Sequence, residues 1–381
     1  MTSARQLTDE IKALAVELGF DLVGVTSAAP FESLEELLLD RIHLGLMGGL
    51  TWFTAERARV AGDVHHIVPA ARSIISLAMS YLAQDAYIPS TPGVPRGRVA
   101  RYAWGRDYHP ILLRQTAKFI ELLAERYGHA DARKGWVDTA RVVDRAVAQR
   151  AGVGWYGKNT CILTRSHGSW VFLAEVVTDL ELLPDLPLRT NCGSCSLCLP
   201  ACPTGALIRP GVMDVGRCIS YLTIEERGMI PRELRPLMGN WIFGCDICQE
   251  VCPVNRQVDG TQRPEFGGDV GMGPSPELLP LLSLSPAAFA ARCSGTPIKR
   301  AKWRGLLRNA CIALGNIGDP VAIPALAGTL LERPDEVIRA HAAWALGRWP
   351  DAAARRSLDT ARATEINPTV QEEINLALAR C

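Results

Sequence analysis

Apolar residues recur at two different spacings along the first half of the chain, and each spacing predicts a different element. Residues 7–18 carry leucine and isoleucine at the spacing of an amphipathic helix. Residues 20–26 (FDLVGVT) form a short apolar run that is typical of a buried strand. A leucine-rich helix at 31–46 and a second strand at 73–81 repeat this order. The alternation of helix and strand predicts an α/β layer.

The same alternation continues to residue 178. We expect a helix at 111–127, a short strand at 135–139, a helix at 140–150 and strands at 161–164 and 170–178. Gly128 is well placed to end the helix at 111–127. The strand at 135–139 delivers Asp138 to its end, where an aspartate ordinarily forms a turn or caps the next helix.

The C-terminal part of the chain contains an internal repeat. The tripeptide ALG at 313–315 recurs at 345–347, which gives a period of 32 residues. Paired amphipathic helices at such a period are typical of a HEAT-like helical repeat. A basic segment precedes the repeat, and it either forms a solvated face or contacts RNA phosphates. Its basic residues are Lys299, Arg300, Lys302 and Arg304.

Eight of the twelve cysteines lie in one stretch, between residues 192 and 252. The first four follow the spacing C-x2-C-x2-C-x3-C-P, which is typical of bacterial ferredoxins with [4Fe–4S] clusters. A second run repeats the last three positions, and its first cysteine is displaced upstream. In two-cluster ferredoxins the fourth cysteine of each run ligates the other cluster. The predicted ligand sets are Cys192, Cys195, Cys198 and Cys252, and Cys202, Cys218, Cys245 and Cys248.

Clustered cysteines also occur in structural zinc sites and in the disulfides of secreted domains. Zinc does not account for three cysteines at this spacing followed by x3-C-P, and disulfides need an oxidising compartment. The N-terminal residues contain no apolar signal segment, and no apolar run reaches the length of a membrane span. We therefore expect a cytoplasmic protein with no membrane contact.

Composition places few limits on the partner. The apolar fraction of 48% is ample for real cores, and the charged fraction of 21% is ordinary for a globular protein. The formal net charge of +1 neither requires nor excludes a nucleic-acid partner. Any contact with RNA therefore depends on a local basic patch.

Two segments of the N-terminal layer carry candidate chemistry. Residues 100–110 (ARYAWGRDYHP) hold more polar and charged groups than a core segment would, so they form either a binding surface or a solvated loop. Their His109 is not assigned as a metal ligand. Residues 151–160 (AGVGWYGKNT) combine three glycines with Lys158, which suits the close approach of a ligand but also an ordinary tight turn.

Several of these stretches together resemble the epoxyqueuosine reductases. The stretches are ARYAWGRDYH, WVDTARVVDRAVAQRAGVGWYGKNT, GSWVFLAEVVTDLEL, the cysteine block, RCISYLTIEERGMIPRELRPLMGNWIFGCDICQEVCPVNR and the helical tail. The resemblance covers nearly the whole chain in the same order. It implies an α/β cobalamin-binding domain, a ferredoxin-like module with two [4Fe–4S] clusters and a HEAT-like region that helps to hold tRNA. The implied reaction reduces epoxyqueuosine to queuosine at the wobble position of tRNA, the last step of queuosine biosynthesis.

The resemblance also implies roles for single residues. Asp138 matches the family's proposed proton donor, and donation near neutral pH would require its pKa to be raised. The implied cobalamin contacts are Arg57, Arg59, Asp138, Lys158, Ile162, Leu173, Ser220, Cys245 and Asp246. The implied tRNA contacts are Arg145, Thr223, Arg227, Arg235 and the basic segment Lys299, Arg300, Lys302 and Arg304. The cluster on Cys202, Cys218, Cys245 and Cys248 is expected to lie nearer to cobalamin, because Ser220 and Asp246 belong to the same stretch.

These expectations divide the chain into four parts. They are a cobalamin-binding α/β domain at 1–189, a two-cluster module at 190–256, a linker at 257–297 and a HEAT-like repeat at 298–381. The expected partners are tRNA carrying epoxyqueuosine and an external electron donor, and we expect a monomer.

Two other functions stay open. One is a dehalogenase-like cobalamin and iron–sulfur reductase of a small molecule, and the other is a non-catalytic electron carrier. A small substrate needs neither the helical repeat nor the basic segment, and an electron carrier does not need the large α/β domain.

Overall fold

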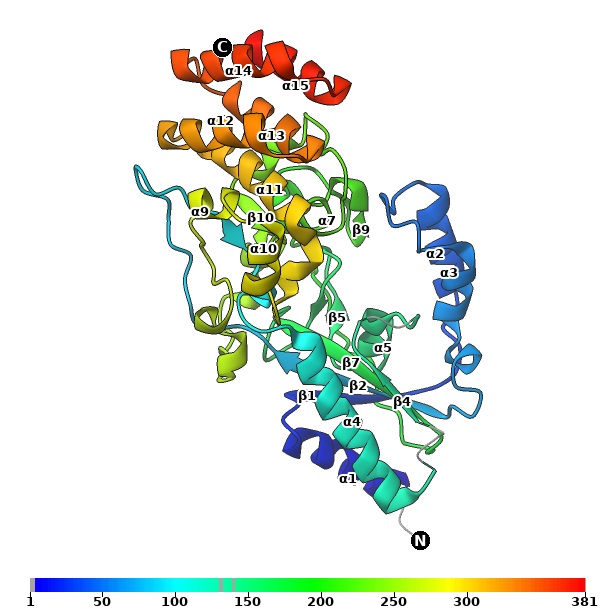
Figure 1. Cartoon of the computed structure of the whole chain (residues 1–381). Helices are drawn as coiled ribbons and strands as arrows, with labels where there is room; N and C mark the ends of the chain where they lie inside the picture. Colours follow the sequence, from blue (N-terminus) through cyan, green and yellow to red (C-terminus); the bar gives the residue numbers. More distant parts are fainter. Residues whose placement is uncertain (1–3, 130–132, 139–140, 381) are drawn as a thin grey trace. The chain divides into compact units, whose positions relative to one another are not determined.

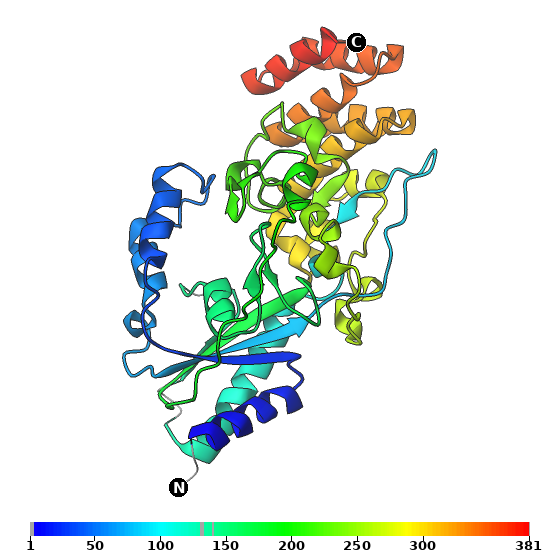
Figure 2. The same cartoon turned by 180° about the vertical axis from the view of Figure 1, so that it is seen from behind.

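The computed structural model describes residues 4–129, 133–138 and 141–380. The chain forms two compact units, and Figures 1 and 2 show the elements of both. No helix within the described ranges is long and apolar enough to cross a membrane. The first unit comprises residues 1–82, 107–216 and 247–262, and the second comprises residues 83–106, 217–246 and 263–381.

An antiparallel four-stranded sheet lies at the centre of the first unit, in the order β1-β2-β7-β4. In its register Ser76 lies opposite Glu175, and Glu175 lies opposite Trp136. All residues of β2 are buried, because helices cover both faces of the sheet. The strands are β1 (Leu22–Ser27), β2 (Ser73–Ser80), β4 (Lys134–Trp136) and β7 (Val171–Thr178).

Different helices cover the two faces of this sheet (Figure 1). On one face Phe172 of β7 stacks against Tyr108, which is the first residue of α4. Side chains alternate along a strand, so Leu173 and Glu175 point to the opposite face, where α5 packs. The helices are α1 (Ala4–Glu17) and α4 (Tyr108–Tyr127) on the first face and α5 (Asp144–Arg150) on the second.

Shorter elements complete the first unit. Two helices, α2 (Leu34–His43) and α3 (Ala55–Gly62), pack against each other. Two hairpins are formed by β5 (Trp155–Tyr156) with β6 (Ile162–Leu163) and by β8 (Leu207–Arg209) with β9 (Val212–Met213). The cysteine runs carry the short helices α6 (Cys198–Ala201) and α8 (Ile247–Glu250).

The second unit contains the helical repeat that the sequence predicts. A Cβ atom on Gly315 would lie 3.1 Å from the Cα atom of Ala345, and one on Gly347 would lie 2.6 Å from the Cα atom of Ala377. The same close contact, between one helix and the next but one, therefore recurs after 32 residues. The helices are α11 (Lys302–Ile317), α12 (Ile323–Glu332), α13 (Glu336–Leu346), α14 (Ala352–Thr364) and α15 (Pro368–Leu378).

The remainder of the second unit packs beside this repeat. The parallel strands β3 (Arg98–Val99) and β10 (Trp241–Phe243) pair, and α7 (Ile219–Ile224) packs against β10 and α11. The region expected as a linker, 257–297, contains the short helices α9 (Leu278–Leu282) and α10 (Pro286–Arg292).

Two local expectations are wrong. Asp138 does not cap α5, because that helix begins at Asp144 with Val143 in the N-cap position. The expected strand end at Thr139 and helix start at Ala140 lie outside the described residues. Residues 100–110 are not simply a surface segment, because Trp104 is fully buried and its indole N–H donates to the Val99 carbonyl at 2.7 Å.

Candidate functional site

Asp138 lies two residues beyond β4 in an unusual backbone conformation. Its φ angle is +44°, in the left-handed region that side chains other than glycine rarely adopt. Aspartate tolerates this region better than most residues, at some cost in strain. Residues held in such conformations cluster at active sites and ligand clamps. The backbone therefore marks Asp138 as a candidate functional residue, independently of any resemblance.

Two side chains from the first turn of α4 bind the Asp138 carboxylate. Tyr108 donates its hydroxyl to Oδ2, and His109 Nε2 lies 2.9 Å from Oδ1. Asp107 caps α4 by accepting the His109 backbone N–H, and its Oδ1 atom also lies 2.7 Å from His109 Nδ1. We call these four residues the Asp138 cluster. All four belong to the first unit.

The imidazole of His109 bridges two carboxylates, and this position determines its charge. Burial disfavours the imidazolium, but the hydrogen bonds to Asp107 and Asp138 outweigh it and raise the pKa of His109 to about 9. His109 therefore carries a proton at neutral pH. The Tyr108 ring supports the arrangement, because it stacks on His109 and on Phe172 with 4.1 Å between ring centroids in each case.

Four of the eight predicted cluster cysteines lie together in the first unit. Burial raises the pKa of the Cys198 thiol, and so do the neighbouring Cys192, Cys252 and Cys195. Cys252 thus lies beside the first three cysteines, although more than 50 residues separate it from each of them in the chain. The described cysteines form no disulfide with one another. Four neighbouring thiols are the number that one [4Fe–4S] cluster binds. Within the described residues no three His, Cys, Asp or Glu side chains are grouped so that they could hold a metal ion.

The glycine-rich turn at 151–160 contacts both cysteine runs. The Lys158 ammonium donates to the carbonyls of Gly193 and Cys195 at 2.8 and 2.7 Å. The adjacent Asn159 is buried, and its amide donates to the Cys248 carbonyl at 3.3 Å. This turn therefore binds the backbone of two predicted cluster ligands, Cys195 and Cys248, and of Gly193 beside Cys192.

Cys218 and Cys245 belong to the second unit. Side chains of α11 donate hydrogen bonds to α7, which follows Cys218, and to β10, which precedes Cys245. The fully buried Arg308 donates to the Leu222 carbonyl at 2.6 Å, and Asn309 donates to the carbonyls of Thr223 and Ile242. The Thr223 hydroxyl accepts the Gly244 N–H at 2.9 Å, beside Cys245. These contacts connect α7 and β10 to the helical repeat.

The other predicted cobalamin contacts divide between the two units. In the first unit Ile162 and Leu173 pack in one apolar cluster. Arg57 lies over the Trp52 ring at 4.6 Å, and Arg59 pairs with Glu35 at 3.6 Å. In the second unit Ser220 lies on α7, and the buried Asp246 accepts the Arg101 backbone N–H and the Tyr87 hydroxyl.

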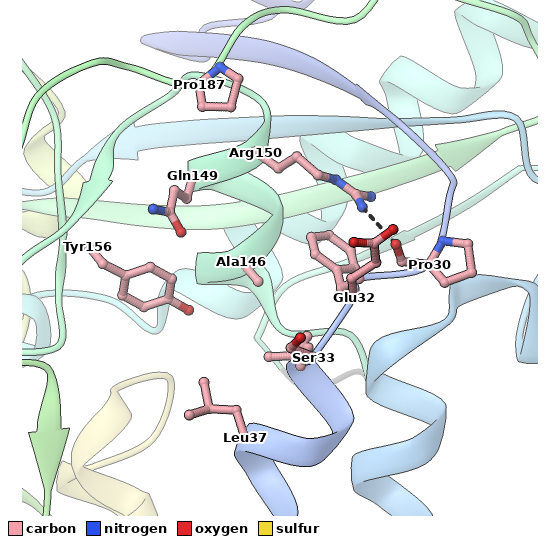
Figure 3. Close-up of a pocket in the computed structure, with 11 residues that line it drawn as sticks. Pro30, Glu32, Ser33, Leu37, Ala146, Gln149, Arg150, Tyr156 and Pro187 are labelled. Carbon is pink, nitrogen blue, oxygen red and sulfur yellow. Dashed lines mark hydrogen bonds between the residues drawn. The ribbon is translucent and has the colours of Figure 1, made fainter.

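A cavity of about 750 Å³ opens in the first unit between the start of α2, helix α5 and Tyr156 (Figure 3). Arg150 closes one side by donating to the Ala29 carbonyl at 2.8 Å and by stacking on Phe31 at 3.4 Å. The remaining lining is largely apolar, from Leu34, Leu37, Ala146 and Pro187 among others. Its size and apolar walls are those of a small-molecule or cofactor site.

The predicted tRNA contacts differ in exposure. Arg145 is exposed and donates to the Thr160 carbonyl. Thr223 and Arg235 are fully buried, and Arg235 pairs with Glu373 at 2.7 Å. The other exposed members lie in the second unit and are Arg227, Lys299, Arg300, Lys302 and Arg304.

Models of known protein families match the segments that carry Asp138, the cysteine runs and the helical repeat. Three family models match: "Epoxyqueuosine reductase QueG, DUF1730" at residues 62–139, "4Fe-4S double cluster binding domain" at 191–255 and "HEAT repeats" at 304–379. An epoxyqueuosine reductase from Bacillus cereus is 37% identical over 98% of this chain and 97% of its own length. The Escherichia coli K12 epoxyqueuosine reductase is 40% identical over 90% of this chain and 89% of its own. The chain belongs to the epoxyqueuosine reductase family.

Solved structures of epoxyqueuosine reductases share the fold. One was crystallised with an epoxyqueuosine-modified tRNA-Tyr stem loop. It matches with a TM-score of 0.92 and 35% identity over 99% of both chains. A Bacillus subtilis epoxyqueuosine reductase, with its catalytic aspartate loop swung out of the active site, matches with a TM-score of 0.90 and 34% identity over 99% of both chains.

Sequence reasoning missed most of the polar groups around Asp138. Tyr108 and His109 stand about 30 residues before Asp138, and nothing in their spacing reveals that they share one carboxylate. One signal was the Asp-x-His pattern at the start of a strong amphipathic helix, which suits an N-cap that also binds the histidine ring. Glu175, in the middle of an otherwise apolar strand, was a second signal.

Proposed function

We propose that this chain reduces epoxyqueuosine to queuosine in tRNA. The observation that carries the proposal is the likeness, over 99% of both chains, to an epoxyqueuosine reductase solved with an epoxyqueuosine-modified stem loop. The reaction replaces an epoxide by a carbon–carbon double bond and releases the oxygen as water. It therefore consumes two electrons and two protons, and the chain must supply both.

The Asp138 cluster supplies the first proton. Since His109 is protonated at neutral pH, its Nε2–H can pass a proton across the 2.9 Å contact to Asp138. Asp138 then delivers that proton to the leaving oxygen. The hydrogen bond from Tyr108 holds the carboxylate in the orientation that accepts from His109.

Two [4Fe–4S] clusters supply the electrons one at a time. The convergence of Cys192, Cys195, Cys198 and Cys252 supports the first ligand set. The spacing of Cys202, Cys218, Cys245 and Cys248 supports the second set. Lys158 and Asn159 act as positioning residues for the cysteine backbone.

Cobalamin is the third cofactor in this proposal. When bound, its corrin supplies a strongly reducing cobalt centre. The family resemblance and the apolar cluster that contains Ile162 and Leu173 support its binding. The residues proposed to hold it are Arg57, Arg59, Asp138, Lys158, Ile162, Leu173, Ser220, Cys245 and Asp246.

The tRNA backbone is proposed to bind exposed basic side chains. Thr223 and Arg235 are buried, so their proposed contribution is to the support of the unit rather than to phosphate contact. The contact is therefore assigned to Arg145 of the first unit and to Arg227, Lys299, Arg300, Lys302 and Arg304 of the second. We further propose a monomer that acts in the cytoplasm and receives electrons from an external donor.

Nucleoside mass spectrometry tests the function directly. The protein is loaded anaerobically with iron–sulfur clusters and cobalamin, supplied with a reductant, and given tRNA that bears epoxyqueuosine. The expected product nucleoside has lost one oxygen atom. If the tRNA stays unchanged while a halogenated small molecule is reduced, the dehalogenase-like alternative replaces this proposal.

A further inference from the structure

A second pair of acidic residues lies on the α5 face of the sheet, outside the Asp138 cluster. Glu175 stands in the middle of β7 and is completely buried. Asp144 is the first residue of α5, which packs on the same face. The two carboxyl groups are neighbours, because each of them alters the pKa of the other. An acidic pair in this position is costly unless something neutralises it.

The Asp144 backbone N–H and the Arg145 charge stabilise the Asp144 carboxylate, but no donor from the described residues binds Glu175. Both carboxyl oxygens of Glu175 and the Oδ1 atom of Asp144 are enclosed and accept no hydrogen bond within the described part of the chain. Two ionised carboxylates in this position would repel each other in a medium of low dielectric constant. One shared proton removes the repulsion between two negative charges. It also supplies a hydrogen bond, because the protonated oxygen donates to the other carboxyl group.

The raised pKa values of both carboxyl groups agree with a shared proton. Burial raises the pKa of Glu175 well above its usual range, and the charge of Asp144 raises it further. Burial also raises the pKa of Asp144, to about 6. Of the two carboxyl groups, the more deeply buried Glu175 is therefore the one that holds the shared proton more tightly.

The pair lies beside the candidate proton donor. Glu175 is opposite Trp136 in the sheet, and Asp138 follows Trp136 by two residues. The negative charge of Asp138 raises the pKa of both Glu175 and Asp144. Asp144 is less deeply buried than Glu175, so it is the member through which the pair exchanges protons with its surroundings. The other charged or titratable groups that act on Asp144 are Arg57, Arg145 and Tyr156.

We propose that Glu175 and Asp144 share one proton and deliver it to Asp138 in each turnover. This inference rests on the proposed function, whose reaction needs two protons while His109 supplies one. The proton leaves Glu175, passes through Asp144 and re-protonates the Asp138 cluster, and water then re-protonates the pair. The electrons come from the external donor through the clusters, so no further reactant is required. Glu175 and Asp144 are positioning residues for proton supply, not groups that touch the substrate.

Infrared spectroscopy of the cofactor-loaded chain without tRNA tests whether the proton is shared. At neutral pH the wild type should show a protonated-carboxyl band that shifts in D₂O. The band should be lost in Glu175→Gln and altered in Asp144→Asn. The control is Glu181→Gln, which removes an exposed carboxylate paired with Arg72 and should leave the band intact.

The pH profile of queuosine formation tests whether the proton is delivered. Glu175→Gln and Asp144→Asn should slow product formation about tenfold or more at neutral pH, and acidic buffer should partly restore it. A band that persists in both variants, or profiles that match the wild type, would overturn the inference. If the wild type forms no queuosine, the proposed function and the delivery step fail together. The infrared band still decides whether the pair holds a proton.

Discussion

His109 Nε2 lies 2.9 Å from Oδ1 of Asp138, and the other ring nitrogen lies 2.7 Å from Asp107. This relationship changes the expected source of the proton. The resemblance implied that burial would have to keep a proton on Asp138 itself, yet the Asp138 side chain is 38% exposed. Because His109 is held as an imidazolium beside it, the aspartate needs only to relay a proton. A strained backbone and a hydrogen bond from Tyr108 fix the carboxylate for that task.

The charge of His109 makes the stability of the first unit depend on pH. A raised pKa means that the folded state binds the proton more tightly than the unfolded state. The stabilisation is fully present below pH 6.5 and is lost as pH rises through about 9. We expect His109→Gln to lower the thermal midpoint near pH 6.5 and to make a much smaller difference above pH 9.

Circular dichroism melting curves at several pH values measure this difference. His66→Gln, which removes an exposed imidazole elsewhere in the unit, controls for the loss of a histidine. A difference between His109→Gln and the wild type that stays constant across the range would show that His109 is not held as an imidazolium.

Lys158 should hold the loop of the first iron–sulfur cluster. Lys158→Met removes two charge-assisted hydrogen bonds, to the carbonyls of Gly193 and Cys195, and keeps the apolar stem. Loss of such a support typically weakens metal retention about 10- to 100-fold. We expect faster release of iron to a chelator and an altered electron paramagnetic resonance signal. Lys118→Met, at an exposed position on α4, is the control, and equal release rates in the two variants would refute the role.

The helical repeat depends on close packing at Gly347. A Cβ atom there would lie 2.6 Å from the Ala377 backbone, so even alanine must displace α15. We expect Gly347→Ala to lower the free energy of unfolding of the repeat by about 1–3 kcal/mol. The matched control is Gly328→Ala, which meets no atom within 4 Å and lies inside α12. It should raise stability by about 0.5–1 kcal/mol. Chemical denaturation of the full chain measures both changes in the free energy of unfolding, a decrease for Gly347→Ala and an increase for Gly328→Ala.

The exposed lysines beside α11 should contribute to tRNA affinity through phosphate contacts. We expect Lys299→Gln combined with Lys302→Gln to weaken binding of all tRNA sequences about equally. The slope of log affinity against log salt should fall by about 1 for each lost contact. Filter binding over a salt series measures both effects. An unchanged slope would indicate that the segment is a solvated face, and Lys118→Gln controls for the loss of a positive charge.

Local pattern was sufficient to predict most of the elements. The apolar runs of β2 and β7, the amphipathic α4 with Gly128 at its end, and the ALG repeat each depend on neighbouring residues, and all appear in the structure. The two errors involve tertiary contacts. Trp104 is buried because its indole finds the Val99 carbonyl, and that partner cannot be read from composition.

The candidate site was only partly predictable for the same reason. Asp138 was found through its place at a strand end and through the family resemblance. Its partners Tyr108 and His109 come from a different helix, and Glu175 reaches Asp144 only once β7 packs under α5. The role of Lys158 likewise follows from two backbone carbonyls whose positions no spacing rule gives.

Single-turnover nucleoside mass spectrometry with Asp138→Asn tests the central claim most directly. The variant keeps the shape of the side chain and removes its ability to relay a proton. We expect it to retain its clusters and to bind tRNA, and to form queuosine at least about 100-fold more slowly than the wild type. Conversion of epoxyqueuosine to queuosine at the wild-type rate by Asp138→Asn would contradict the account.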